Sequence, residues 1–223
     1  APFDNTQGGD GTVTIIWGWD SESTPGSLCP DAAQITTLAS KGDDQNFGTT
    51  LESIDIDGDG LQELLIGLPD AISGGVFNLN GADLAALTSG ALDNGAIPEY
   101  YMGHSYWVED LPLTTRLDDG PGFGVAISAI THPNETGAFI AIGSDQGAGK
   151  VILYEFTSSN PSGDIVALVN GETHRPGGQL GAGLHLQAVG SNLYLIVGAP
   201  EHDAPDGVDQ GGVYPFIFPL PSL

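Results

Sequence analysis

The sequence has very few basic residues. It contains 4 Lys and Arg against 29 Asp and Glu, which gives a formal net charge of -25. A surface this acidic repels nucleic acid and anionic membrane surfaces, and it attracts divalent cations. We therefore expect no nucleic-acid partner and no membrane insertion, and we expect a cation among the ligands.

Cysteine and long apolar runs are also scarce. Cys29 is the only cysteine, so no disulfide can form within the chain, and we interpret it as an inert thiol. No stretch approaches the ~20 apolar residues of a membrane-spanning helix. The sequence begins at Ala1 without an initiator methionine, as a processed mature protein does. A shortened sequence would begin in the same way. The secreted or cell-surface location that we expect follows from the acidity, because high salt outside cells would screen the repulsion between the charges.

Glycine and proline, by contrast, are abundant. There are 34 Gly and 15 Pro, yet 40% of the residues are hydrophobic, which is too many for a disordered low-complexity chain. The apolar runs between the glycines and prolines are short and rich in Val, Ile, Leu, Tyr and Phe, which favours strands over helices. The sequence predicts an all-β fold.

Three segments repeat the same order of turn, strand, hairpin, strand, glycine and strand. Each begins with Phe-Gly or Leu-Gly, has a glycine at the end of its second strand, and has another glycine before its third strand. In chain order the three units comprise Phe47-Gly48, strands at 50–54 and 63–69, and a third strand after Gly74; Phe123-Gly124, strands at 125–130 and 138–143, and a third after Gly149; and Leu180-Gly181, strands at 184–189 and 193–200, and a third after Gly211.

These units resemble FG-GAP repeats, the repeats of integrin α-like propellers, over roughly residues 46–218. The third unit departs from the family pattern with Leu180 in place of phenylalanine, and the second with Gly143-Ser144-Asp145 in place of Gly-Ala-Pro. The resemblance implies a β-propeller, in which four-stranded antiparallel blades surround a central axis.

We expect residues 1–223 to form one propeller region of about four blades or partial blades. Its expected parts are a half-blade with outer strands at 1–45, with a third strand at 11–17 and an outer strand at 33–38; a blade at 46–121 with an insertion at 81–118; a blade at 122–178; and a partial blade at 179–223. An open arc leaves sheet edges exposed, so we expect another chain or a missing segment to complete the propeller. Alternatively, the N-terminal strands complete the C-terminal blade and close a four-bladed ring.

The segment from Asp55 to Glu63 is the strongest chemical signal. Gly58 and Gly60 let its backbone curl tightly, so that carboxylates at alternate positions converge into a cage of oxygen atoms. Hard oxygen ligands in this number suit Ca²⁺ better than zinc or copper. The expected calcium ligands are the side chains of Asp55, Asp57, Asp59 and Glu63 and the backbone carbonyl of Leu61.

An EF-hand begins with the same pattern but requires a glutamate at position 12 of the loop, where this sequence has Ile66. The flanking residues also read as strands. A solvated acidic hairpin without metal is the other alternative. By resemblance, the loop is the hairpin between the first and second strands of a blade, and its metal is structural. We expect one metal site of this type.

Other candidate sites carry weaker signals. Asn134-Glu135-Thr136 is an N-glycosylation sequon on an expected hairpin tip. Aromatic residues in the insertion are candidates for a stacking platform that binds a sugar or a peptide, with burial as the alternative. The resemblance places the acidic loop at 201–209 on the face where partners bind, as a candidate second cation site, with a solvated loop as the alternative. The candidate ligand-binding residues are Tyr101, His104, Trp107, Asp203 and Asp206.

The sequence contains no nucleophile elbow, phosphate loop or HExxH motif, so we expect no enzyme. The expected function is that of an extracellular, calcium-stabilised propeller acting as a protein- or glycan-binding or assembly module. The alternatives are the non-catalytic propeller of a secreted hydrolase and a structural subunit of an extracellular filament or sheath.

Overall fold

The computed structural model describes residues 11–17, 35–40, 46–69, 74–88, 104–112, 114–171, 178–202 and 210–220, and every structural statement below concerns these ranges. They form an all-β fold with one short α-helix, α1 (Gly81–Thr88), and one 3₁₀ turn, η3 (Val108–Asp110). In these ranges no helix has the length and apolar character needed to cross a membrane.

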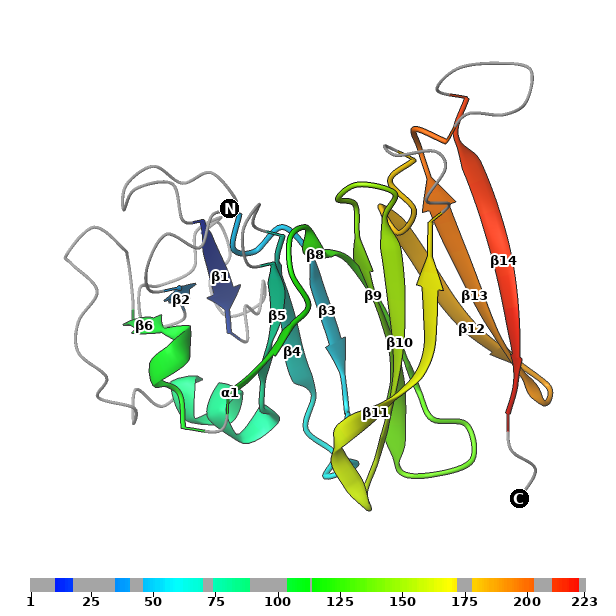
Figure 1. Ribbon diagram of the computed structural model, residues 1–223. Helices are drawn as coiled ribbons and strands as arrows, with labels where there is room; N and C mark the ends of the chain where they lie inside the picture. Colours follow the sequence, from blue (N-terminus) through cyan, green and yellow to red (C-terminus); the bar gives the residue numbers. More distant parts are fainter. Residues whose placement is uncertain are drawn as a thin grey trace, which may run out of the picture.

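The strands form four sheets, which are stacked side by side in chain order (Figure 1). Sheet I contains β1 (Thr12–Ile16), β2 (Ile35–Ala39) and β6 (His104–Trp107). Sheet II contains β3 (Leu51–Ile54), β4 (Glu63–Leu68), β5 (Gly75–Leu79) and β7 (Thr115–Asp118). Sheet III contains β8 (Phe123–Thr131), β9 (Gly137–Ser144), β10 (Lys150–Thr157) and β11 (Asn160–Asn170). Sheet IV contains β12 (Gly183–Val189), β13 (Asn192–Ala199) and β14 (Gly212–Pro219).

Sheets II, III and IV are meanders whose strands lie in the order in which they occur in the chain. All pairings in the four sheets are antiparallel except that of β2 with β6, which is parallel. The first strands of sheets II, III and IV contact one another, because β8 lies against both β3 and β12. This side of the stack is therefore where the sheets come closest together.

Three hydrophobic clusters fill the spaces between neighbouring sheets, one between each pair. Sheet III has a neighbour on both sides, and all eight residues of β9 are buried. Sheet IV has a neighbour only on the side of sheet III, so buried and more exposed residues alternate along β13. The burial of each strand thus reports how many sheets cover it.

Glycines let the sheets approach closely at equivalent positions of the repeats. A side-chain carbon at Gly67 would lie 2.2 Å from the carbonyl oxygen of Gly124 in the next sheet, and one at Gly143 would lie 2.0 Å from that of Gly181. Only glycine fits these positions without displacing backbone. The repeated glycines of the sequence are therefore the contact points between sheets.

The structure corrects four expectations. The expected insertion at 81–118 includes β7, the outer strand of sheet II, and also supplies α1 and β6. The strand expected at 33–38 is β2, and it occupies the middle of sheet I because β6 pairs with its free edge. The alternative in which the N-terminal strands complete the C-terminal blade is wrong, since β1 and β2 pair with β6 in a sheet of their own. The fourth correction is α1, because the expected all-β fold included no helix and this segment was expected only as the start of an insertion.

Candidate metal centre

The predicted metal loop is the hairpin that joins β3 to β4 in sheet II. Asp55 organises its backbone: one carboxylate oxygen accepts the amide hydrogen of Gly58 at 2.6 Å and the other that of Gly60 at 3.1 Å. Both glycines have positive φ, 75° and 88°, a conformation that other residues rarely adopt. The tight curl expected from the sequence is therefore present.

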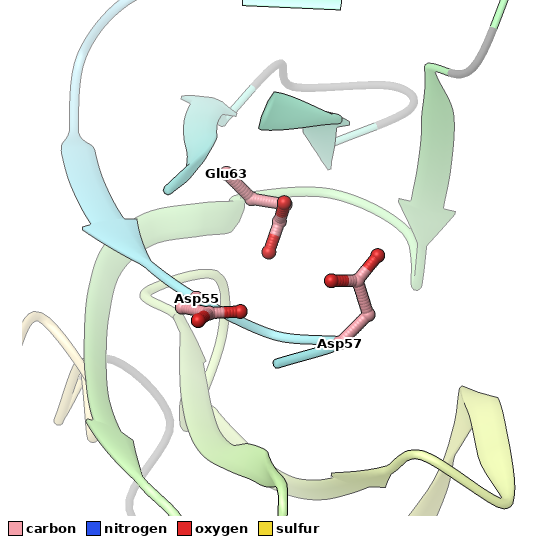
Figure 2. Close-up of side chains that lie close together, drawn as sticks. All are labelled: Asp55, Asp57 and Glu63. Atoms are coloured by element: carbon pink, nitrogen blue, oxygen red, sulfur yellow. The ribbon is translucent and has the colours of Figure 1, made fainter. Parts of the chain in front are cut away.

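Three carboxylates converge in this hairpin. Asp55, Asp57 and Glu63 each offer one oxygen atom, and these oxygens all lie within 4.8 Å of one another. Figure 2 shows the three side chains turned toward a common space, with Asp55 and Asp57 on either side of it and Glu63 above them. Three negative charges this close repel one another unless a cation or protons neutralise them. The arrangement has the donor atoms and charge of a cation site.

Glu63 is the buried member of this triad, with 2% of its surface exposed. One of its oxygens accepts the amide hydrogen of Ile56, and the other accepts that of Gly81 at 3.1 Å. Gly81 is the first residue of α1. Asn80 caps the N-terminus of this helix, because its side-chain oxygen accepts the amide hydrogen of Ala82 at 2.8 Å. Glu63 therefore joins the metal loop to α1.

Burial raises the pKa of Glu63 above its ordinary value. The amide hydrogens of Ile56 and Gly81 oppose this rise, and the charges of Asp57 and Asp55 add to it. Burial therefore makes ionisation of Glu63 more costly than in water, and a cation bound to the triad would offset that cost. Since each carboxylate oxygen can accept more than one bond, Glu63 can accept both amide hydrogens and still bind a metal ion.

Asp59 and Leu61 were also expected to be ligands, but the triad does not include them. An oxygen of Asp59 accepts the amide hydrogen of Leu61 at 2.7 Å, while the amide of Asp59 itself donates to Asp57 at 3.1 Å. Asp59 therefore shapes the turn. Ligation by its carboxylate and by the carbonyl of Leu61 stays a prediction.

The hairpin between β8 and β9 of sheet III packs against this loop. A side-chain carbon at Gly58 would lie 1.7 Å from the Cγ2 methyl carbon of Thr136, so the two turns touch at a position that only glycine can occupy. The sequon residue Asn134 is half-buried in the same turn. Its glycosylation stays a prediction.

A buried histidine, His132, which no sequence motif singles out, stabilises that turn. Nδ1 of His132 accepts the amide hydrogens of Asn134 and Glu135 at 3.2 and 3.0 Å, so the ring proton is on Nε2, 3.0 Å from an oxygen of Glu155. The ring also stacks on Phe139, with 4.6 Å between centroids. All its polar atoms have partners, which makes it a structural residue.

The other candidate ligand-binding residues do not form a site that the structure describes. Tyr101, Asp203 and Asp206 lie outside the described residues. His104 and Trp107 belong to β6, which pairs with β2, and Trp107 is half-buried. Their neighbour Tyr106 packs in the core between sheets I and II, as the burial alternative expected for these aromatics.

Sequence reasoning missed α1 and its contact with Glu63, although a signal for the helix is present. Asn80 is a favourable N-cap residue, and the helix formers Ala and Leu dominate the eight residues that follow. The partners of His132 had no sequence signal, because they lie on another strand and in a turn.

Comparison with known proteins adds no relative to these observations: no protein-family model matches the chain, and no curated protein matches it.

Proposed function

We propose that this protein is an extracellular or cell-surface β-propeller module of the FG-GAP kind, stabilised by Ca²⁺, that binds a protein or glycan and assembles with another chain. It acts through shape and has no catalytic role. The observation that carries the proposal is the convergence of Asp55, Asp57 and Glu63 in the hairpin between the first two strands of a repeat.

The sheet arrangement supports the propeller. Sheets II, III and IV are meanders in chain order, and their first strands β3, β8 and β12 are neighbours, as strands around a common axis would be. The glycine contacts from Gly67 to Gly124 and from Gly143 to Gly181 repeat from one sheet to the next, as expected of blades in one repeat array.

The chemistry of the loop supports calcium. All three donors are carboxylate oxygens, and they belong to one hairpin in a chain of net charge -25. Calcium accepts six to eight oxygen ligands in variable geometry, whereas magnesium demands a near-ideal octahedron. The cation would neutralise the mutual repulsion of the triad and the burial of Glu63, and so would hold β3, β4 and α1 together.

Thermal unfolding in calcium and in chelator tests the proposal. At a calcium concentration about 100 times Kd, binding adds roughly 2.7 kcal/mol of stability. For a domain of this size that raises Tm by about 5–10 °C. The Asp57→Ala variant should lose this rise, while Asp164→Ala, which removes an exposed charge on β11, should retain it.

Magnesium at the same concentration separates specific binding from screening of the acidic surface. A Tm that responds equally to both cations, or equally in Asp57→Ala and wild type, would falsify the metal site.

A further inference from the structure

Within the described ranges, sheet IV is covered on one side only, by sheet III. Leu193, Leu195 and Val197 of β13 pack toward sheet III, and the alternate residues of the same strand point away from it. Figure 1 shows β12–β14 at the end of the stack opposite to β1, β2 and β6. The side of sheet IV that faces away from sheet III is called the open face below.

The repeat allows the open face to be compared with two covered ones. Val76, Val151 and Val213 each stand two residues after the glycine that precedes a third strand. Val76 and Val151 are both 0% exposed, in the clusters that join their own sheet to the next one. Val213 is 71% exposed. Valine at this repeat position is therefore buried in sheets II and III and exposed in sheet IV.

A second position behaves in the same way. Leu65, Ala141 and Ile196 each stand two residues before the glycine that ends a second strand. Leu65 and Ala141 are 0% exposed beneath the following sheet, and Ile196 is 37% exposed. Sheet IV therefore presents the apolar residues that sheets II and III use to bind the sheet after them.

The glycines that precede the third strands show which residues of the following sheet contact the covered faces. A side-chain carbon at Gly74 would lie 2.5 Å from the backbone nitrogen of Phe123, and one at Gly149 would lie 2.2 Å from the carbonyl oxygen of Leu180. At the equivalent Gly211 the nearest atom is the oxygen of Pro200, which directly follows β13 of the same repeat, at 3.0 Å. Among the residues that the structure describes, none takes the place that the Phe-Gly or Leu-Gly turn of a following sheet takes at the covered faces.

The composition of sheet IV favours an apolar partner, and its edge strand favours contact through the face of the sheet over addition of a strand at its edge. The three strands of sheet IV contain no Asp, Glu, Lys or Arg, although the chain carries 29 acidic residues. Its edge strand β14 includes Pro215 and Pro219, which have no amide hydrogen to donate to an added strand. Exposed Val213 and Ile217 then add to a patch that soluble proteins normally cover.

We propose that the open face of sheet IV docks a further sheet of this repeat type, presented by another protein chain and entering with an aromatic residue or leucine followed by glycine. This rests on the repeat-propeller function proposed above and specifies the partner and its contact surface. A second copy is a poor occupant, because its Phe47, Phe123 and Leu180 are buried against its own sheets.

A matched pair of substitutions tests whether the face is free. Val213→Asp should shift Tm by less than about 2 °C, as surface substitutions do. Val151→Asp, the same change at the covered position, should abolish the cooperative transition or lower Tm by more than about 10 °C. If Val213→Asp is as damaging as Val151→Asp, the face is already covered and the proposal is overturned.

A tandem protein tests the occupant. Residues 122–171 are repeated after Leu220 through a flexible linker, so that the added sheet is at millimolar effective concentration. In a Cys29→Ser background, the thiol introduced by Val213→Cys should react with a thiol reagent at least about tenfold more slowly in the tandem protein than in the unextended chain. Phe123→Asp in the added copy alone should restore the fast rate.

If the Val213→Cys thiol reacts at the same rate in the tandem and unextended proteins, the proposal is overturned. This holds both when the added sheet folds without docking and when it stays unfolded. A slow rate in the unextended chain, together with a dimeric mass by light scattering, would assign the face to a second copy and overturn it as well. The thiol rates do not require the metal loop, and the Tm values of the matched pair are compared at one calcium concentration, so failure here is distinct from failure of the metal site.

Discussion

The carboxylate of Glu63 accepts the amide hydrogen of Gly81, with 3.1 Å between oxygen and nitrogen, and this bond connects the hairpin of sheet II to the N-terminus of α1. Calcium that binds Glu63 should therefore slow hydrogen exchange in α1. We expect about tenfold slower exchange of the amides at 81–84 in calcium than in chelator, a difference of about 1.4 kcal/mol.

Glu63→Gln supplies the control. An amide side chain keeps one acceptor oxygen but places a donor against the second backbone amide, so the calcium response of α1 should disappear. The prediction is contradicted if calcium slows hydrogen exchange in the hairpin of the wild type but leaves the exchange rates at 81–84 unchanged. The bond between Glu63 and Gly81 would then not couple calcium binding to the stability of α1.

Asp57 and Asp59 should differ in their importance for calcium binding. Asp57 belongs to the triad, whereas an oxygen of Asp59 accepts the amide hydrogen of Leu61. Asp57→Ala should weaken calcium affinity by more than about tenfold, or 1.4 kcal/mol, and Asp59→Ala should weaken it less. Calorimetric titration of both variants measures this order. The reverse order would restore Asp59 to the ligand set and displace Asp57 from it.

Glu52 should make the protein less stable as the pH rises. Burial raises its pKa above the ordinary 4.5, against a weaker opposing effect of the Ser53 amide. Between pH 4.5 and the folded pKa, the folded chain holds a proton that the unfolded chain has lost, so this contribution to stability declines through that window. Above it, Glu52→Gln should be more stable than wild type.

Urea unfolding from pH 4 to pH 8 measures the effect, with the advantage of Glu52→Gln shrinking toward pH 4. Glu201→Gln, at an exposed position, controls for the general loss of one negative charge. Parallel pH profiles for wild type and Glu52→Gln would contradict the prediction.

Gly143 and Gly198 occupy the same repeat position but should respond differently to alanine. A side-chain carbon at Gly143 would lie 2.0 Å from the carbonyl oxygen of Gly181, whereas at Gly198 the nearest atom is 3.6 Å away. Gly143→Ala should cost roughly 2–4 kcal/mol because sheet III must move from sheet IV, and Gly198→Ala less than about 1 kcal/mol. Chemical unfolding of both variants checks this, and similar losses would refute it.

The strand pattern was readable from the sequence because each strand lies between glycines or prolines that break it. The strands expected at 125–130 and 138–143 lie within β8 and β9, and that expected at 184–189 lies within β12. The partners of β6 were not readable, since its parallel pairing with β2 depends on a long connection rather than on a local pattern.

The metal loop shows the same limit at the scale of single residues. Spacing and glycines identified the hairpin and its acidic residues, because loop curvature is a local property of Gly58 and Gly60. The division of the acids between the triad and the turn could not be read from spacing. It depends on the amides of Ile56 and Gly81 that orient Glu63 and on that of Leu61, which is bound to Asp59.

The parallel pairing of β6 with β2 also has a consequence for the order of folding. β6 follows β3, β4 and β5 in the chain, yet it completes sheet I. During synthesis, sheet I therefore cannot be completed until Trp107 has been added to the chain, and by then β3, β4 and β5 of sheet II have been synthesised. The first two sheets should consequently form as one cooperative unit, whereas sheets III and IV can be added one after the other as the chain emerges.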